Sequence, residues 1–533
     1  MSIETEIKLL TDGKSLSRLA TLDLVGRAAV GRPRRRRLVA TYFDTPDGHL
    51  RQAGLTLRLR REGARLVQTI KSEAGANGNP LSRGEWEAEV TGERPDLAAA
   101  DASPVPALLA EAEISPDLLE PQLSVAINRK IFALAIDGSS IEMAVDRGRI
   151  AAGDRSVPVA EVELELKSGD PLRLLDFVRA LMAEMPLRVE HRSKSARGFA
   201  LLDGEPRPQK AGWVELDSEL SIEQAFKRVV ASCFAQMAAN EVPALAGRDP
   251  EGVHQLRVGI RRLRSALSLF GRALPPDMVA RLKPQLRDAM AAFGPAREWD
   301  VLLTETLDPL RQRVSDDPGL KRLRRIADAA RADGHRHLRE MLLSAAYTEL
   351  KLTLLETLSG DWADHDEDRL LTPWIDPTRN APPWAAPVES YADRSLRKRH
   401  KQLRRIGNGH ATMTVEELHE LRIAAKKLRY AADFFRSLYA KKKVRRYIAA
   451  LAAVQDCLGA INDGAVGRTR VAEAWEKLGG LSRRSTRRAR AEGAVEGWFA
   501  AVEHVELANF AAAWKRFLDV DRFWNKPKRL ADY

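Results

Sequence analysis

Apolar and polar residues alternate in the stretch Ile3-Glu4-Thr5-Glu6-Ile7-Lys8-Leu9. Successive side chains of a β-strand point to opposite faces, so this period of two predicts a strand with one charged face and one apolar face. Taken alone, such a segment is most simply a surface strand whose charges lie in water.

The same alternation recurs through the first 200 residues, and like charges repeatedly share one face. The charged sets are Arg58 with Arg60, Glu85 with Glu87, and Glu161 with Glu163 and Glu165. Several such strands would repel one another on a solvent face, but they make sense if their faces converge on an enclosed site. Carboxylates suit hard divalent cations, and arginine and lysine suit phosphoryl oxygens. We therefore predict an antiparallel barrel with its charged faces inward and its apolar faces covered by helices at 16–25, 104–112 and 172–185.

The hydrophobic period changes from two to 3.6 at about residue 215, which predicts long helices in the rest of the chain. A segment with two prolines and two glycines, 204–212, separates the halves, and the proline-rich segment 372–387 divides the second half again. We predict an α+β multidomain chain. Its expected parts are a β-rich domain at 1–203, a linker at 204–216, a helical domain at 217–515 in two parts (217–370 and 388–515), and a tail at 516–533.

Composition excludes several classes of protein. No apolar run approaches the ~18 residues that span a bilayer, and charged residues stand where a signal peptide needs an apolar stretch. Cys233 and Cys457 are the only cysteines and have no metal-ligand spacing, which argues against a disulfide framework or a thiolate metal site. We expect a cytoplasmic protein with no membrane partner.

Positive charge is concentrated in the second half. Residues 1–203 contain 29 basic and 30 acidic residues, a net charge of −1, out of totals of 86 and 74. The remainder therefore carries 57 basic and 44 acidic residues, a net charge of +13. A helical domain with this surplus suggests a polyanionic partner, such as nucleic acid, a membrane surface or polyphosphate.

The first 203 residues resemble the CYTH, or triphosphate tunnel metalloenzyme, superfamily. The resemblance begins with the ExExK signature at Glu4, Glu6 and Lys8, and further motifs follow in order: 42–47, 57–60, 69–71, 83–87, Arg129, 146–148, 161–165 and 194–198. It implies an eight-stranded tunnel that binds a triphosphate end-on with one or two divalent metals, Mg²⁺ or Mn²⁺. The run Arg34 to Arg37 is more simply a solvated loop and strand start, although its last arginine could face inward.

The resemblance also assigns roles to single residues, each carried over by its place in a motif. The expected metal ligands are Glu4, Glu6, Glu161 and Glu163. The expected phosphate-binding residues are Lys8, Arg58, Arg60, Lys71, Arg129 and Lys194. Glu85 and Glu87 are expected to complete the metal site or to position water. Which carboxylate acts as a base stays open.

The helical half contains an internal repeat. The segment that starts at His254 matches the segment that starts at His419, and the offset of 165 continues for more than forty positions, through Phe270 with Phe435 and Gly294 with Gly459. Each copy places basic residues at positions 0, +3, +7 and +10, which form one stripe on a helix. The basic residues expected to bind are His254, Arg257, Arg261, Arg262, Arg264, His419, Arg422, Lys426, Lys427 and Arg429.

Two simpler explanations compete for this pattern: a solvated basic face, and histidines that serve as helix caps. The duplication favours two cationic stripes that grip a linear polyanion. The pattern, from about 217 to 515, resembles a CHAD domain, which implies binding of inorganic polyphosphate. Basic residues at 394–401 suit the same ligand.

The leading functional hypothesis is metal-dependent hydrolysis of inorganic triphosphate to pyrophosphate and phosphate, with polyphosphate bound by the helical domain and an association with polyphosphate granules. The alternatives are a non-catalytic polyphosphate-binding or granule-targeting protein, a nucleoside or thiamine triphosphatase, and an adenylate cyclase. Nucleic acid ranks last, because the stripes lack interleaved aromatic residues and only 6% of the chain is aromatic.

Overall fold

The computed structural model describes residues 2–75, 82–204, 206–314, 316–360, 362, 382–409, 413–477 and 485–524, with main chain alone at 2–4, 73–75, 82–83 and 415. The chain divides into two compact units. The first contains residues 1–207 and 343–361, and the second contains 208–342 and 362–533. Among the helices described, none is long and apolar enough to cross a membrane.

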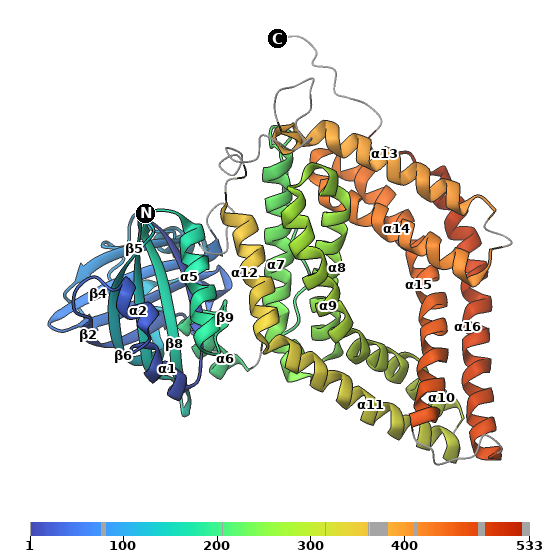
Figure 1. The fold of residues 1–533 in the computed structure, drawn as a ribbon, viewed down its shortest axis with the longest axis horizontal. Coiled ribbons are helices and arrows are strands. Elements are labelled where there is room, and N and C mark those ends of the chain that lie inside the picture. The colour runs from blue at the N-terminus through green and yellow to red at the C-terminus, as the bar shows by residue number, and fades with distance from the viewer. Residues whose placement is uncertain are drawn as a thin grey trace, which may run out of the picture. The chain divides into compact units, whose positions relative to one another are not determined.

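The first unit is built on a nine-stranded antiparallel sheet. Its strands are β1 (Ser2–Leu10), β2 (Arg34–Asp44), β3 (Leu55–Glu62), β4 (Arg65–Gly75), β5 (Ser82–Val90), β6 (Glu120–Ile136), β7 (Ser139–Ala152), β8 (Arg155–Ser168) and β9 (Arg188–Glu190). They lie in the order β5-β4-β3-β2-β6-β7-β8-β1-β9. β1 also pairs with β5, over Ser2 to Thr5 only, so the sheet curls until β5 reaches β1 along this short segment (Figure 1).

This arrangement corrects the expected eight-stranded barrel in two ways. The ninth strand, β9, is three residues long and lies beside Lys8 to Leu10 of β1. The sheet is also not closed, because β5 at one end pairs through four residue pairs with β1, and β9 forms the other end. A strand of three residues has too few alternating positions to be recognised from a sequence pattern.

Helices cover the apolar outer face of this sheet. They are α1 (Gly13–Leu19), α2 (Asp23–Ala28), α3 (His49–Gln52), α4 (Val105–Glu111), α5 (Pro171–Glu184) and α12 (Ala345–Ser359). α6 (Lys194–Asp203) packs on the inner face instead, where Phe199 shares a core with Leu38 and Ala40 of β2. The helices expected at 104–112 and 172–185 are α4 and α5, whereas the one expected at 16–25 is divided into α1 and α2. Leu55, Leu57 and Leu59 of β3 pack in one core with Val105 and Leu109 of α4.

The second unit is helical over its described residues. Its helices are α7 (Ile222–Ala246), α8 (Pro250–Phe270), α9 (Pro276–Val301), α10 (Asp308–Arg313), α11 (Pro318–Leu342), α13 (Val388–Gly407), α14 (Val415–Phe435), α15 (Lys441–Lys477) and α16 (Thr486–Asp519). The offset of 165 maps both ends of α8 onto those of α14. The two equivalent residues Phe270 and Phe435 contact each other edge to face, with ring centroids 5.7 Å apart. The copies therefore meet at equivalent positions.

Candidate active site

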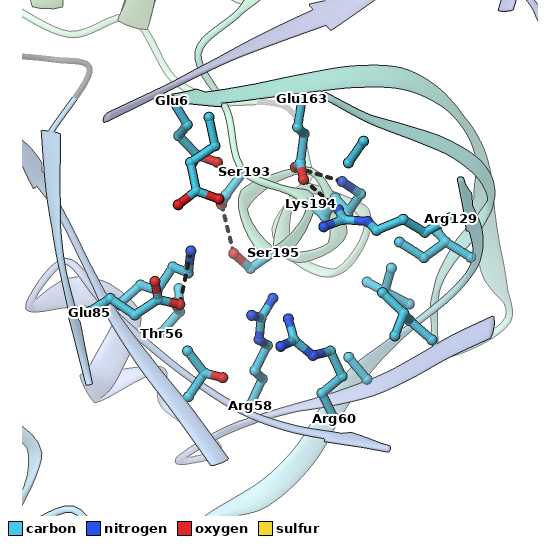
Figure 2. Close-up of a pocket in the computed structure, with 18 of the residues that line it drawn as sticks. Glu6, Thr56, Arg58, Arg60, Glu85, Arg129, Glu163, Ser193, Lys194 and Ser195 are labelled. Atoms are coloured by element: carbon cyan, nitrogen blue, oxygen red, sulfur yellow. Dashed lines mark hydrogen bonds and ion pairs between the residues drawn. The ribbon is translucent and has the colours of Figure 1, made fainter. Parts of the chain in front are cut away.

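A cavity of about 280 Å³ lies inside the curled sheet. Ten of the twelve residues expected in the tunnel line it: Glu6, Lys8, Arg58, Arg60, Lys71, Glu85, Glu87, Arg129, Glu163 and Lys194. Figure 2 shows Arg58 and Arg60 reaching from β3 toward the centre, with Glu163 and Lys194 across the cavity. The strand register accounts for this arrangement, because Arg58 lies opposite Tyr42 and Arg60 lies opposite Ala40, all on the inner face.

The other two expected residues are placed differently. Glu161 lies behind the cavity wall, where 1% of its side chain is exposed, and it accepts hydrogen bonds from Lys194 and Arg197. The side chain of Glu4 lies outside the described residues, and its main chain is paired with Arg83 of β5.

Further residues complete the lining. In the run Arg34 to Arg37, Arg36 rather than Arg37 lines the cavity. Arg36 lies opposite Arg129 of β6 and forms an ion pair with Glu62 at 3.0 Å. The period of two could have identified it, since Arg36 shares a face with Leu38, Ala40 and Tyr42. The part of the lining on β2 and β6 between Arg36 and Tyr42 is apolar, with Leu38, Ala40, Val125 and Ile127.

A buried network of acids and bases lies at one side of the cavity. Asp146, Glu161 and Glu163 bring ligand oxygens within 4.8 Å of one another. Arg129 donates two hydrogen bonds to Asp146, at 2.7 and 2.6 Å, and a third to Glu163. Lys194 contacts all three acids, at 2.8 Å from both Asp146 and Glu163. These contacts fix two cations at the cavity wall.

The network determines the charge of the carboxylates that face the cavity. Burial acts to raise the pKa of Glu163, but the positive charges of Lys194 and Arg129 outweigh burial and hold that pKa well below its usual range. The pKa of Glu6 is also lowered, because Lys8 and Lys71 overcome the effect of burial. Both carboxylates are therefore ionised near neutral pH.

The N-terminal end of α6 also contributes to the cavity. Ser193, Lys194 and Ser195 line it, and the hydroxyls of Ser193 and Ser195 lie 2.6 Å apart. Ser193 caps the helix by accepting a hydrogen bond from the backbone N–H of Ala196. The positive end of a helix dipole favours an anion at this position.

A second candidate site lies where α8 and α14 carry their basic stripes. Arg257, Arg261, Arg422 and Lys426 act on one another electrostatically. Burial and then the charge of Arg422 lower the pKa of Lys426 to about 7, and burial and then Arg261 lower the pKa of Arg257 to about 10. The buried Nε atoms of Arg257, Arg261 and Arg422 have no hydrogen-bond partner among the described residues. After burial, neighbouring arginines have the larger effect on the pKa values of Lys426 and Arg257, whereas Asp463 has the larger effect on that of Arg422.

The remaining residues of the stripes have different surroundings. Arg262 is buried, donates to Gln236 at 2.9 Å and to Ser232 at 3.1 Å, and lies over the ring of Phe434. Arg429 donates to Gln455 at 3.0 Å. Burial and then Arg297 lower the pKa of His254 to about 4, whereas His419 is exposed and bonded to Asn462. Arg264 is exposed and Lys427 is half-buried.

Comparison with known families agrees with this division. Residues 2–199 match the CYTH domain family, and residues 228–472 match the CHAD domain family. The chain is a CYTH domain followed by a CHAD domain.

Individual relatives match parts of the chain. The inorganic triphosphatase of Haemophilus influenzae is 33% identical over 162 residues, which are 30% of this chain and 45% of that protein, so the match spans less than half of the relative. The CHAD domain of the plant Ricinus communis is 29% identical, with a TM-score of 0.47, over 59% of this chain and 98% of that chain. A candidate adenylyl cyclase from Hippeastrum with a dominant triphosphatase activity is 19% identical, with a TM-score of 0.27, over 38% of this chain and 96% of that chain.

Sequence reasoning missed one important residue of the CYTH domain. Asp146 appeared only as part of a family motif, because the apolar Ala144 separates it from Glu142, the other acid on its face of β7. Its role depends on the register of β6 with β7, in which Arg129 lies opposite Asp146. Only the paired strands reveal this contact.

Proposed function

We propose that the CYTH domain hydrolyses inorganic triphosphate to pyrophosphate and phosphate. The observation that carries this proposal is a single cavity lined by cations on several strands and by ionised carboxylates. Arg58 and Arg60 each keep a buried Nε without a hydrogen-bond partner among the described residues. Such atoms favour a ligand with many acceptor oxygens, and a triphosphate has them.

The carboxylates of the cavity fit a divalent cation such as Mg²⁺ or Mn²⁺, because they supply the hard oxygen ligands that these ions require. Glu6 and Glu163 are the best candidates, since both line the cavity and both have lowered pKa values. Asp146 and Glu161 bind the cations Lys194, Arg129 and Arg197 but, unlike Glu163, they do not line the cavity, so we assign them to holding those cations rather than to the metal. A bound cation would withdraw charge from the phosphoryl oxygens during hydrolysis.

The protein's own residues would position the substrate. Arg58 and Arg60 on β3 and Arg129 and Lys194 across the cavity can contact phosphoryl oxygens from opposite sides and offset charge that spreads over them. The apolar wall of β2 and β6 offers no hydrogen-bond donor from its side chains. The phosphate chain would therefore lie against the charged side, which restricts its orientation.

We further propose that the CHAD domain binds inorganic polyphosphate at the stripes of α8 and α14. The support is the cluster of Arg257, Arg261, Arg422 and Lys426. The Nε atoms of its three arginines have no hydrogen-bond partner among the described residues, and the pKa values of Arg257 and Lys426 are lowered by burial and then by repulsion from neighbouring arginines. A linear polyanion would relieve that repulsion. A polyphosphate-binding domain on the same chain also favours an inorganic substrate for the CYTH domain. Cytoplasmic location and granule association stay predictions.

The proposal is tested by phosphate release from tripolyphosphate, ATP and long-chain polyphosphate, each with Mg²⁺, Mn²⁺ or EDTA. We expect metal-dependent release, fastest from tripolyphosphate and absent in EDTA. Preference for ATP would favour the nucleoside triphosphatase alternative, and cyclic AMP as product would favour the cyclase. Tight polyphosphate binding without turnover of any triphosphate would leave a binding protein.

A further inference from the structure

One helix of the CYTH unit comes from the CHAD part of the sequence. α12, residues 345–359, follows α11 after two residues, yet it belongs to the first compact unit, whereas α11 belongs to the second. It packs against α5 and β9. The cavity-bearing unit is therefore incomplete without a segment that lies more than 130 residues beyond its other elements.

The contacts of α12 with this unit are specific. The buried ammonium group of Lys351, with 3% of the residue exposed, donates a 2.7 Å hydrogen bond to the main-chain oxygen of Val189 in β9. Arg179 of α5 contacts Glu349 at 3.0 Å and Glu356 at 2.6 Å, which lie about two turns apart on the same helix. Removing the donor of a buried hydrogen bond leaves its acceptor unsatisfied, which is costly, so this bond constrains the position of Val189 in β9.

The strand that Lys351 contacts leads directly to the candidate site. β9 is the last strand in the sheet order, and its three residues pair with Lys8 to Leu10 of β1. Within that register Glu190 lies opposite Lys8, which lines the cavity. Three residues beyond Glu190, the chain reaches Ser193 and Lys194 at the start of α6. A strand this short has few ladder hydrogen bonds of its own, so an external contact influences its position strongly.

We propose that Lys351 is a positioning residue for the tunnel site, acting through β9 on Lys194. In this account the CHAD part of the chain contributes to catalysis by holding one wall of the CYTH cavity, in addition to any ligand that it binds. The expected effect on kcat/KM rests on the proposed triphosphatase activity, whereas the expected effect on the position of β9 does not.

The test compares wild type with Lys351→Met, which keeps the length of the side chain and removes the donor. We expect faster amide hydrogen exchange at residues 188–195 and a fall in kcat/KM for tripolyphosphate of about tenfold, mostly through a higher KM. Because Lys351 acts through Lys194, adding Lys351→Met to Lys194→Ala should change KM by less than about twofold.

Leu109→Ala serves as the matched control, because Leu109 is a buried residue of α4 in the same unit whose core cluster contains no residue of β9. It should lower the unfolding temperature at least as much as Lys351→Met while leaving both KM and exchange at 188–195 unchanged. Equal effects of the two variants on KM, or unchanged exchange at 188–195 in Lys351→Met, would overturn the proposal. If wild type hydrolyses no triphosphate, the proposed function fails, and the exchange comparison still decides the role of Lys351.

Discussion

The ammonium group of Lys194 lies 2.8 Å from the carboxylate of Asp146, a side chain with no exposed surface. The same carboxylate accepts two hydrogen bonds from Arg129. One buried acid therefore aligns two cations that line the cavity, from β6 and from α6. The geometry makes Asp146 a support for phosphate-binding groups.

Asp146→Asn should lower both stability and activity. The substitution removes the negative charge that Arg129 and Lys194 share inside the protein. Loss of one partner of a buried ion pair costs about 3 kcal/mol. We expect a loss of that size in the free energy of unfolding by urea, and a fall in kcat/KM for tripolyphosphate of at least about tenfold. Asp154→Asn, at an exposed turn between β7 and β8, should change neither quantity.

The lowered pKa of Glu163 predicts a stability that depends on pH. Its ordinary value is 4.5, and the folded-state pKa lies well below that. The stability that Glu163 contributes is therefore fully present above pH 4.5 and is lost as the pH falls through the folded-state pKa. Glu163→Gln should lose less stability than wild type when both are unfolded at a series of pH values from about 6 to about 3. If the free energy of unfolding fell equally with pH in both proteins, the account of this site would be contradicted.

Neighbouring arginines of the CHAD stripe should behave differently. Arg261 has a buried Nε with no hydrogen-bond partner among the described residues, whereas Arg262 is bonded to Gln236 and Ser232. Arg261→Ala should weaken polyphosphate binding by about tenfold with little change in the unfolding temperature. Arg262→Ala should mainly lower the unfolding temperature. Calorimetric titration with polyphosphate at fixed salt, together with thermal unfolding, distinguishes the two; the reverse pattern would refute the assignment.

Polyphosphate binding should weaken as the pH rises through neutrality. The pKa of Lys426 is lowered to about 7, first by burial and then by Arg422, Arg261 and Arg257, with Asp463 opposing them. Its positive charge is thus present at about pH 6 and largely lost by about pH 8.5, where a polyanion gains less from it. Lys426→Arg should keep its charge over this range, so its affinity should vary less with pH than that of wild type. The same pH dependence in both proteins would exclude Lys426 as the cause.

The sequence predicts the fold and the candidate site where a hydrophobic or charge period repeats. The alternation around Arg58 and Glu85 indicates which residues share a face, and the curled sheet brings those faces together around one cavity. The repeat offset likewise anticipates that α8 and α14 have the same length and equivalent ends.

Features that depend on contacts between distant segments could not be predicted in this way. β9 is too short to show a period, and α12 joins the first unit only through packing and polar contacts such as Lys351 with Val189. Arg262 lies beside the stripe on a helical wheel, but its neighbours on α7, Ser232 and Gln236, direct it into the core. Asp146 acquires its partners only when β6 and β7 pair.

The most direct test of the central claim is the rate of phosphate release from tripolyphosphate, with Mg²⁺ or Mn²⁺, by wild type, Glu6→Gln and Glu111→Gln. Glu6 lines the cavity, whereas Glu111 is exposed at the end of α4. We predict that Glu6→Gln lowers kcat/KM by at least about a hundredfold while Glu111→Gln matches wild type. Equal rates for all three proteins would place the reaction outside this cavity and contradict the account.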